Sequence, residues 1–431
     1  MISPVLRLET NLSGLHAAEA DPATYTAPPM AALTVLSWIL LGIAALTALY
    51  WAVVLVRVQR INATRPTVRR GLGRAAPRGG WPAVSVVIPA HNEERVIDRC
   101  VRSVLQQDYP QLEVIVVLDR CTDGTLDILQ GLADADPRLT LLINETCPDD
   151  WAGKCNAARL GAQQADGDLL LFIDADTHAH PELLKAAVSV AIERELGLLS
   201  LLSTLTCEHA FERTAQPVAS MTLMTLYPPD LVNRLPKGRP FANGQFMLFD
   251  RACYESIGGH DAVKDDLLED IAFARCVARS DRRVNILNAD GLFTCSMYSS
   301  LDSFRTGWLR IFIEACKRKP ARMRKMSRRV LWTGTVMPVA MLPCIAVGVV
   351  LAATSDLGLG IGLSATAVGG ILFQFTALAC IHRMGRQPIA AVCGHPAGSM
   401  EVSRILKRAA DVLDEGRPVV WAGKSYVLEA R

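Results

Sequence analysis

The apolar residues of this chain follow two patterns, one of long unbroken runs and one of short runs separated by polar turns. Three long runs lie at residues 31–56, 330–353 and 357–381, and each is about as long as a helix that crosses a bilayer. Between the first two, from about residue 83 to residue 317, short runs alternate with stretches whose apolar residues recur at helical spacing. The pattern predicts an α/β domain flanked by one N-terminal and two C-terminal transmembrane helices.

The short apolar runs of the central region predict strands. They read "AVSVVIPA", "LEVIVVLD", "LTLLIN" and "DLLLFIDAD", and the first two lead through polar turns into helical patterns. Because each run is continuously apolar, we expect a parallel sheet that is covered by helices on both faces. Ligands of such a sheet bind at the carboxyl ends of its strands.

Charges beside the long runs predict how the chain is oriented. Arg7 is the only Lys or Arg ahead of the first run, whereas clusters of basic residues occupy 57–78 and 317–329. Basic residues are retained on the cytoplasmic side. A cleaved signal peptide is the alternative for the first run, but this run starts about thirty residues in and is too long for the apolar core of such a peptide.

These flanks define a division of the chain. We expect a multi-pass protein of the inner (cytoplasmic) membrane whose catalytic domain is cytoplasmic. Outside the three membrane runs, the expected segments are a non-cytoplasmic N-terminal segment (1–30), a basic linker (57–82), the central domain (83–317) and a cytoplasmic tail (382–431).

Overall composition adds little to this division. The chain has 45 basic and 43 acidic residues, and a formal charge of +2 argues neither for nor against nucleic-acid binding. We expect no nucleic-acid partner. The twelve cysteines contain no Cys-x-x-Cys pair, so we interpret them as reduced thiols that act as small apolar core residues.

Two aspartates directly follow the last predicted strand. Asp174 and Asp176 stand one residue apart at the end of "LLLFIDAD", where an open α/β sheet places its ligands. A few hard oxygen ligands suit Mg²⁺ or Mn²⁺ that is also held by the phosphates of a substrate. The alternative is that Asp176 caps the helix that begins around "HPELLKAAV".

Five stretches resemble a known enzyme family in their order and approximate spacing. They read "VSVVIPAHNEERVIDRCVRSVLQQDYP", "EVIVVLDRCTDGT", "WAGKCNAARLGA", "LLLFIDADTHAHPELL" and "LEDIAFARCVARSDRRV". Over about Val84 to Arg310 they are similar to family 2 glycosyltransferases of the GT-A (nucleotide-diphospho-sugar transferase, Rossmann-like) fold. With "LYPPDLVN", the three apolar runs and "WAGKSY", the chain looks most like membrane-bound enzymes that glycosylate lipids, above all the hopanoid-associated group.

The resemblance implies roles for single residues. Asp119 would bind a uracil base, Lys154 would lie beside the diphosphate, and Asp176 would be the main metal ligand. Asp270 would be the catalytic base, with Glu269 beside it. Together with these, the resemblance implies that the donor or the metal is bound by Pro89, Ala90, Glu93, Asp174, Gly244 and Gln245.

The chemistry of glycosyl transfer fits these residue types. A departing nucleotide diphosphate carries negative charge, which a divalent cation and a lysine stabilise. The attacking hydroxyl must lose a proton, which an aspartate opposite the leaving group can accept. One base and direct attack from the far face imply inversion at the anomeric carbon.

One stretch departs from the pattern of processive relatives. Polysaccharide synthases carry Gln-x-x-Arg-Trp after the base, whereas this chain has "SFRTGWLRIF", with its tryptophan ahead of the last arginine. The departure argues against long-chain polymerisation. Arg305, Trp308 and Arg310 either bind the donor diphosphate or form a basic, aromatic helix that rests on lipid headgroups.

Two other classes of protein would share some of these features. A non-catalytic, nucleotide-sugar-binding assembly protein of the membrane would keep Asp119 and Asp174 but lose the base, and Asp270 is present. A dinucleotide-binding oxidoreductase has the same layered fold but needs Gly-x-Gly-x-x-Gly after the first strand. The chain has "PAHNEE" there.

We therefore expect an inverting, non-processive hexosyltransferase that uses a UDP-sugar and Mg²⁺ or Mn²⁺ to glycosylate the hydroxyl of a membrane lipid. Its expected partners are the nucleotide-sugar donor, the lipid acceptor and the membrane. Hopanoid, carotenoid, polyprenol and ceramide acceptors all fit these residues, and so do several sugars.

Overall fold

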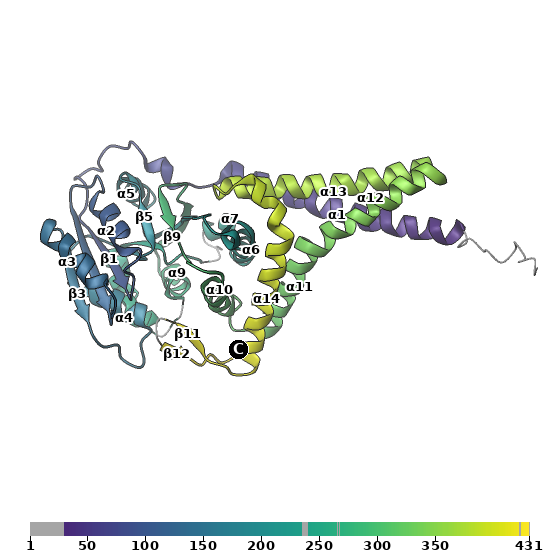
Figure 1. Ribbon diagram of the computed structural model, residues 1–431. Helices are drawn as coiled ribbons and strands as arrows, with labels where there is room; N and C mark the ends of the chain where they lie inside the picture. Colours follow the sequence, from purple (N-terminus) through teal and green to yellow (C-terminus); the bar gives the residue numbers. More distant parts are fainter. Residues whose placement is uncertain (1–29, 235–239, 265, 267, 422–423, 431) are drawn as a thin grey trace, which may run out of the picture.

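The chain forms a sheet-containing domain from which three long helices project together (Figure 1). This computed structural model describes residues 30–234, 240–264, 266, 268–421 and 424–430. Of the expected N-terminal segment, only Met30 falls within the described residues. Helix α1 (Met30–Thr64) leads into the domain, and α12 (Met337–Thr354) and α13 (Leu357–Met384) extend beside it.

A seven-stranded sheet forms the centre of the domain, in the order β3-β2-β1-β4-β8-β6-β9. Its strands are β1 (Val84–Ala90), β2 (Leu112–Asp119), β3 (Leu139–Asn144), β4 (Leu169–Ile173), β6 (Leu196–Leu202), β8 (Phe246–Asp250) and β9 (Arg283–Asn288). The four predicted strands are β1 to β4, and they are mutually parallel. The α/β class is thereby confirmed.

The expectation of a purely parallel sheet is wrong for one strand. Strand β8 runs antiparallel to both of its neighbours, β4 and β6. After β6 the chain does not cross over the sheet: Leu202, residues of α6 (Ala210–Leu226) and Asn243 all line the cavity at the edge where β6 ends. Strand β8 therefore begins at that edge and runs back.

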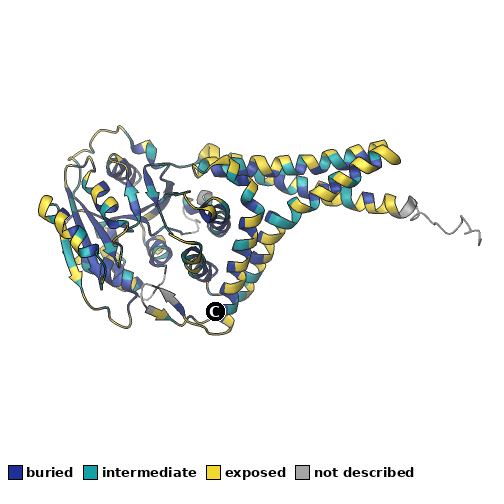
Figure 2. Cartoon of the chain, viewed as in Figure 1, coloured by how far each residue is buried: buried dark blue, intermediate teal, exposed yellow. Residues whose placement is uncertain are grey.

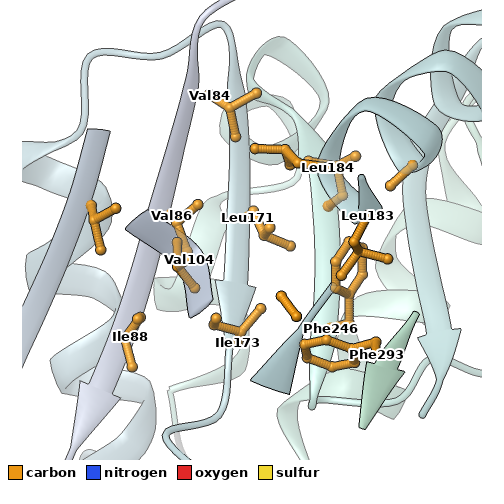
Figure 3. Packing of buried hydrophobic residues seen from close by; sticks show 14 of the residues in the cluster. Val84, Val86, Ile88, Val104, Leu171, Ile173, Leu183, Leu184, Phe246 and Phe293 are labelled. Atoms are coloured by element: carbon orange, nitrogen blue, oxygen red, sulfur yellow. The ribbon is translucent and has the colours of Figure 1, made fainter. Parts of the chain in front are cut away.

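Helices cover both faces of the sheet, as the apolar strands predict. Successive side chains of a strand point to opposite faces, so Val86 and Ile88 of β1 join one core and Val87 the other. Figure 3 shows the first core, where Val86 and Ile88 lie near Leu171 and Ile173 of β4. Helices α2 (Ile97–Leu105), α3 (Thr125–Ala135) and α5 (Leu183–Glu193) cover this face, and α4 (Gly153–Gln164), α8 (Arg251–Ser256) and α9 (Glu269–Arg279) cover the other.

A third hydrophobic core joins the sheet domain to the projecting helices. It is built from α6, α10 (Leu301–Ala315), α11 (Pro320–Leu331) and α14 (His395–Asp414). The segment expected as a tail, residues 382–431, contains α14 and a hairpin of β11 (Val419–Trp421) and β12 (Lys424–Tyr426). Val419 and Leu428 are buried in this core, so the C-terminal part of the chain packs against the domain.

Three helices are long and apolar enough to cross a membrane, at Leu33–Thr64, Pro320–Thr354 and Leu357–Met384. The second and third contain the predicted runs 330–353 and 357–381, and the first covers the predicted run 31–56 from residue 33 onward. The second passes through a π-helical turn, η4 (Trp332–Val336), between α11 and α12. Ala44, Met341 and Leu363 pack between the three helices, while apolar side chains such as Leu46 and Leu372 are exposed on their outer faces (Figure 2).

The basic linker continues α1 and then attaches to the domain. Val68 of the short helix η2 (Val68–Gly71) is fully buried. Asp290 pairs with Arg65 at 3.2 Å, with Arg69 at 3.6 Å and with Arg386 at 3.3 Å. One carboxylate thus ties the base of α1 and the segment after α13 to the edge of the sheet.

Candidate functional site

The candidate site lies where the carboxyl ends of β1, β2 and β4 border a cavity of about 1190 Å³. All the expected site residues except Arg305 line this cavity. They are Pro89, Ala90, Glu93, Asp119, Lys154, Asp174, Asp176, Gly244, Gln245, Glu269, Asp270, Trp308 and Arg310. Residues from five separate motifs therefore meet in one place.

Lys154 is the central cation of the site. It lies in the first turn of α4, and its Nζ is 2.7 Å from Asp174 Oδ1 and 2.7 Å from Glu269 Oε1. Burial opposes ionisation of Lys154, but the two carboxylates outweigh it and raise the pKa of the lysine. Burial likewise opposes ionisation of Glu269, and Lys154 outweighs it and lowers the pKa of that carboxyl. Lys154 and Glu269 are therefore charged at neutral pH.

Asp270 is placed by the first turn of α9 and by the backbone of Gly244. The Gly244 N–H donates to Asp270 Oδ2 at 2.8 Å, and the Ile271 N–H donates to Oδ1 at 2.7 Å. A Cβ at Gly244 would lie 3.2 Å from Lys154 Nζ and 3.3 Å from Asp270 Oδ2, so the glycine allows this close approach. Burial, and next the charge of Glu269, raise the pKa of Asp270 to about 7. Such a carboxylate can accept a proton near neutral pH.

The two aspartates after β4 lie beside further negative charge. Burial and the charge of Asp174 raise the pKa of Asp176 well above its ordinary value, and burial and Asp174 raise the pKa of Glu93 to about 7. The Cys295 thiol donates to Asp176 Oδ1 at 3.4 Å. Repulsion of this kind is what a divalent cation would relieve, and Mg²⁺ is commonly held by one or two carboxylates plus substrate phosphates. The carboxylate oxygens of Asp174 and Asp176 are suitable ligands for such a cation.

The capping alternative for Asp176 is wrong. A short strand, β5 (Thr177–Ala179), follows the aspartate and pairs with β10 (Phe293–Cys295). Helix α5 begins only at Leu183, with Glu182 at its N-cap. The carboxylate of Asp176 therefore stays at the cavity instead of at a helix end.

Asp119, the expected base-binding residue, is 2% exposed and already engaged. Arg120 lies 2.6 Å from its Oδ2, and Asn144 Nδ2 donates to its Oδ1 at 2.7 Å. The backbone carbonyl of Asp119 is 2.6 Å from His91 Nδ1. A nucleotide base that reaches this carboxylate must therefore share it with Arg120 and Asn144.

Arg305, Trp308 and Arg310 of the stretch "SFRTGWLRIF" have different surroundings. Trp308 is 2% exposed within the third core, and it lines the cavity together with Arg310. Arg305 points to α14 instead, with its Nε 2.6 Å from Glu401 Oε1. The structure therefore brings two of the three to the site and leaves the third outside.

Replacing Arg305 by alanine is expected to leave the KM for the donor within about twofold of wild type, because the side chain does not reach the cavity. Stability should fall by less than about 1 kcal/mol, since the lost pair with Glu401 is partly exposed. Donor titrations and urea unfolding of the purified variant would measure both. A large rise in the donor KM would contradict the assignment.

Sequence reasoning missed residues that only the fold brings to the site. His91, Arg120 and Asn144 surround Asp119, and Tyr298 lines the cavity after β10. Arg120 and His91 stand next to singled-out motifs, so their positions gave a signal. Asn144 and Tyr298 gave none, because their contacts depend on strand pairing and on the return of the chain to the cavity.

Apolar side chains form much of the cavity wall on the side of the projecting helices. These apolar side chains come from four helices: Tyr50, Trp51 and Val54 of α1; Met221, Leu223 and Met224 of α6; Met326 and Val330 of α11; and Ile381 of α13. Arg57 of α1 and Arg329 of α11 also line the cavity. Methionine adapts its shape to irregular apolar surfaces. The volume exceeds the 300–1,000 Å³ or so of a typical single-ligand pocket, so the cavity has room for more than one substrate.

Comparison with known proteins identifies the domain. Residues 85–258 match the family model of Glycosyl transferase family 2. The chain is 27% identical to 4,4'-diaponeurosporenoate glycosyltransferase of Staphylococcus haemolyticus over 233 residues, which are 52% of this chain and 60% of that protein. It is 36% identical to glycosyltransferase AglE of Haloferax volcanii over 110 residues, 25% of this chain and 35% of that protein. The chain therefore carries a family 2 glycosyltransferase domain, which confirms the predicted family.

These relatives extend beyond the matched region. The chain spans about 60% of the first relative and about a third of the second. Among solved structures, a mannosyltransferase from Pyrobaculum calidifontis in complex with GDP-Man and Mn²⁺ is 21% identical, with a TM-score of 0.45 over 83% of this chain and 99% of that one.

Proposed function

We propose that this protein is an inverting, non-processive glycosyltransferase that moves a sugar from a UDP-sugar to the hydroxyl of a membrane lipid. The observation that carries the proposal is the shape of the cavity. One continuous space joins Lys154, Asp174 and Asp270 to the apolar faces of α1, α6 and α11. A polar donor and an apolar acceptor therefore have adjacent places.

Asp270 and Lys154 have different roles in the proposed reaction. Asp270, held by the N–H groups of Gly244 and Ile271, accepts the proton of the attacking hydroxyl. Lys154 lies between Asp174 and Glu269 and supplies positive charge where the diphosphate of the donor departs. Because the base acts on the acceptor side, attack from the face opposite the leaving group inverts the anomeric carbon.

Asp174 and Asp176 would hold a Mg²⁺ or Mn²⁺ ion together with the phosphates of the donor. The described residues contain no group of three or more His, Cys, Asp or Glu arranged to hold a metal ion, so the proposed site depends on the donor phosphates to complete its ligands. The ion would neutralise charge that builds up on the departing diphosphate.

The proposed orientation in the membrane rests on the basic residues beside the candidate membrane helices. With the basic residues of 57–78 and 317–329 on the cytoplasmic side, the sheet domain faces the cytoplasm and its soluble donor. The apolar wall of the cavity then lies at the base of the candidate membrane helices, where a lipid hydroxyl can reach Asp270. Anionic lipid headgroups would attract the basic segments.

The direct test is nucleotide release by full-length, detergent-purified protein. The assay offers a panel of UDP- and GDP-sugars with a total bacterial lipid extract, with Mn²⁺ or Mg²⁺ or with a chelator. Metal-dependent release of UDP together with a new glycolipid supports the proposal. Release of GDP alone would show that the donor is a GDP-sugar. The absence of any product would favour the non-catalytic, nucleotide-sugar-binding assembly protein.

The pH dependence of kcat/KM is expected to report the state of Asp270. The free enzyme should lose activity as the pH falls through about 7, because the raised pKa of Asp270 leaves the base protonated below that value. Initial rates at limiting acceptor would measure this loss, and a profile that stays flat down to about pH 5 would contradict the role of Asp270.

A further inference from the structure

A group of polar side chains lines the part of the cavity next to the projecting helices, away from the carboxylates. His395 and Ser399 lie one turn apart on α14, Thr333 and Gly334 belong to η4, and His382 is near the end of α13. These elements come from the C-terminal third of the chain, whereas the catalytic carboxylates follow β4 or begin α9. In Figure 1, α14 lies on the side of α6 that faces the projecting helices, and α9 lies on the side of the sheet.

Two atoms of this group are buried without a hydrogen-bond partner among the described residues. They are His395 Nδ1 and Ser399 Oγ, in side chains that are 5% and 0% exposed. A buried polar group without a partner costs about 1–3 kcal/mol, and native structures contain few of them. Both residues line the cavity, where a ligand can supply the missing partner.

The backbone opposite these side chains is irregular. Helix η4 is a π-helical turn, and such turns frequently occur at functional sites. A Cβ at Gly334 of this turn would collide with the Ser399 hydroxyl and would lie 3.3 Å from His395 Nε2, so the glycine allows a close approach. The second candidate span thus approaches α14 closely enough to hold both side chains in place.

We propose that His395 and Ser399 form a polar subsite that binds a hydroxyl group on the apolar acceptor, separate from the hydroxyl that is glycosylated. The inference rests on the proposed function for the acceptor's place in the cavity. It adds that the acceptor has at least two hydroxyl groups, one at Asp270 and one at this subsite.

The chemistry of the two side chains suits a neutral hydroxyl. Burial, and next His382, lower the pKa of His395 to about 4, so its imidazole is neutral at neutral pH. A neutral imidazole offers one donor and one acceptor, and a serine hydroxyl offers both. A hydroxyl can donate to one and accept from the other, whereas a phosphate would find no positive charge on these two residues.

The test compares binding of matched alcohols to full-length protein in detergent, without nucleotide sugar. The probes are a long-chain diol and the corresponding monool, and a polycyclic diol and its monool. Each is titrated in a thermal-shift assay on wild type, Ser399→Ala and His395→Phe. We expect wild type to prefer the diol of at least one pair by about three- to tenfold, the value of one hydrogen bond, and both variants to lose the preference.

A matched control comes from another buried serine. Ser189 Oγ on α5 also has no partner among the described residues, but Ser189 does not line the cavity. Ser189→Ala should keep the preference for the diol. Since partition of a probe into the detergent is the same for every variant, differences between the proteins report the subsite.

Two results would overturn the proposed subsite. Equal binding of diol and monool by wild type in both pairs would overturn it, and so would a preference that survives in Ser399→Ala. Because the assay measures binding alone, these results are independent of whether a nucleotide sugar is turned over. Failure of the proposed function is instead seen in the absence of nucleotide release.

Discussion

Replacing Asp270 by asparagine is expected to lower kcat by about 10²- to 10⁴-fold, the contribution typical of a general base. An asparagine of the same size can keep one of the two backbone hydrogen bonds, from Gly244 or Ile271, but it cannot take a proton from the acceptor. The KM for the donor should change little. Steady-state rates of UDP release, measured over a range of donor concentrations, would check both values.

A matched control separates loss of the base from a change in the fold. Asp127 lies in the first turn of α3, as Asp270 does in α9, but its side chain is exposed and outside the cavity. Asp127→Asn should keep its activity. If Asp270→Asn turned over at the rate of wild type while its donor and acceptor bound normally, another group would have to be the base.

Replacing Lys154 by methionine is expected to destabilise the protein by about 3 kcal/mol and to lower kcat by about 10²-fold or more. The variant leaves Asp174 and Glu269 close together without their shared cation, and loss of one partner from a buried ion pair typically costs roughly 3–5 kcal/mol. The value is at the lower end because Asp174 is partly exposed. The rate falls because positive charge beside the departing diphosphate is lost.

The loss of stability should depend on pH with a defined sign. Lys154 lowers the pKa of Glu269 in the folded protein, so its stabilisation is present above the ordinary glutamate pKa of 4.5 and is lost as the pH falls through the lowered value. The difference between wild type and Lys154→Met should therefore shrink on acidification. Chemical unfolding at several pH values would measure it.

A surface lysine provides the control for this second variant. Lys185 pairs with the exposed carboxylate of Asp108 at 2.6 Å, and such pairs contribute about 0–1 kcal/mol. Lys185→Met should therefore cost less than 1 kcal/mol or so and leave kcat unchanged. Equal effects of the two substitutions would show that Lys154 has no special place in the site.

The arrangement of the cavity suggests why one chain combines the domain with membrane helices. In the proposed function, residues after the sheet strands bind the donor, and Trp51 of α1, Met326 of α11 and Ile381 of α13 complete the apolar wall. Neither part encloses the cavity alone. The three candidate membrane helices therefore line the candidate site together with the sheet domain.

The sequence by itself determined the features that depend on local pattern. Continuous apolar runs predicted β1 to β4 and the three long helices, since burial on both faces or in lipid requires apolar residues at every position. The family resemblance predicted that Lys154, Asp174 and Asp270 belong to one site, and the fold brings them together. The resemblance also predicted the family 2 glycosyltransferase domain that the comparison confirms.

Only the tertiary structure decided what depends on contacts between distant segments. The reversed direction of β8 follows from the path of α6 at one edge of the sheet, which no local pattern reveals. Arg305 and Arg310 lie on the same helix, yet Arg305 faces Glu401 of α14 while Arg310 faces the cavity, because the packing of α10 sets the direction of each side chain. The return of α14 to the domain likewise places His395 and Ser399 on the cavity wall, since a shared hydrophobic core draws that segment back.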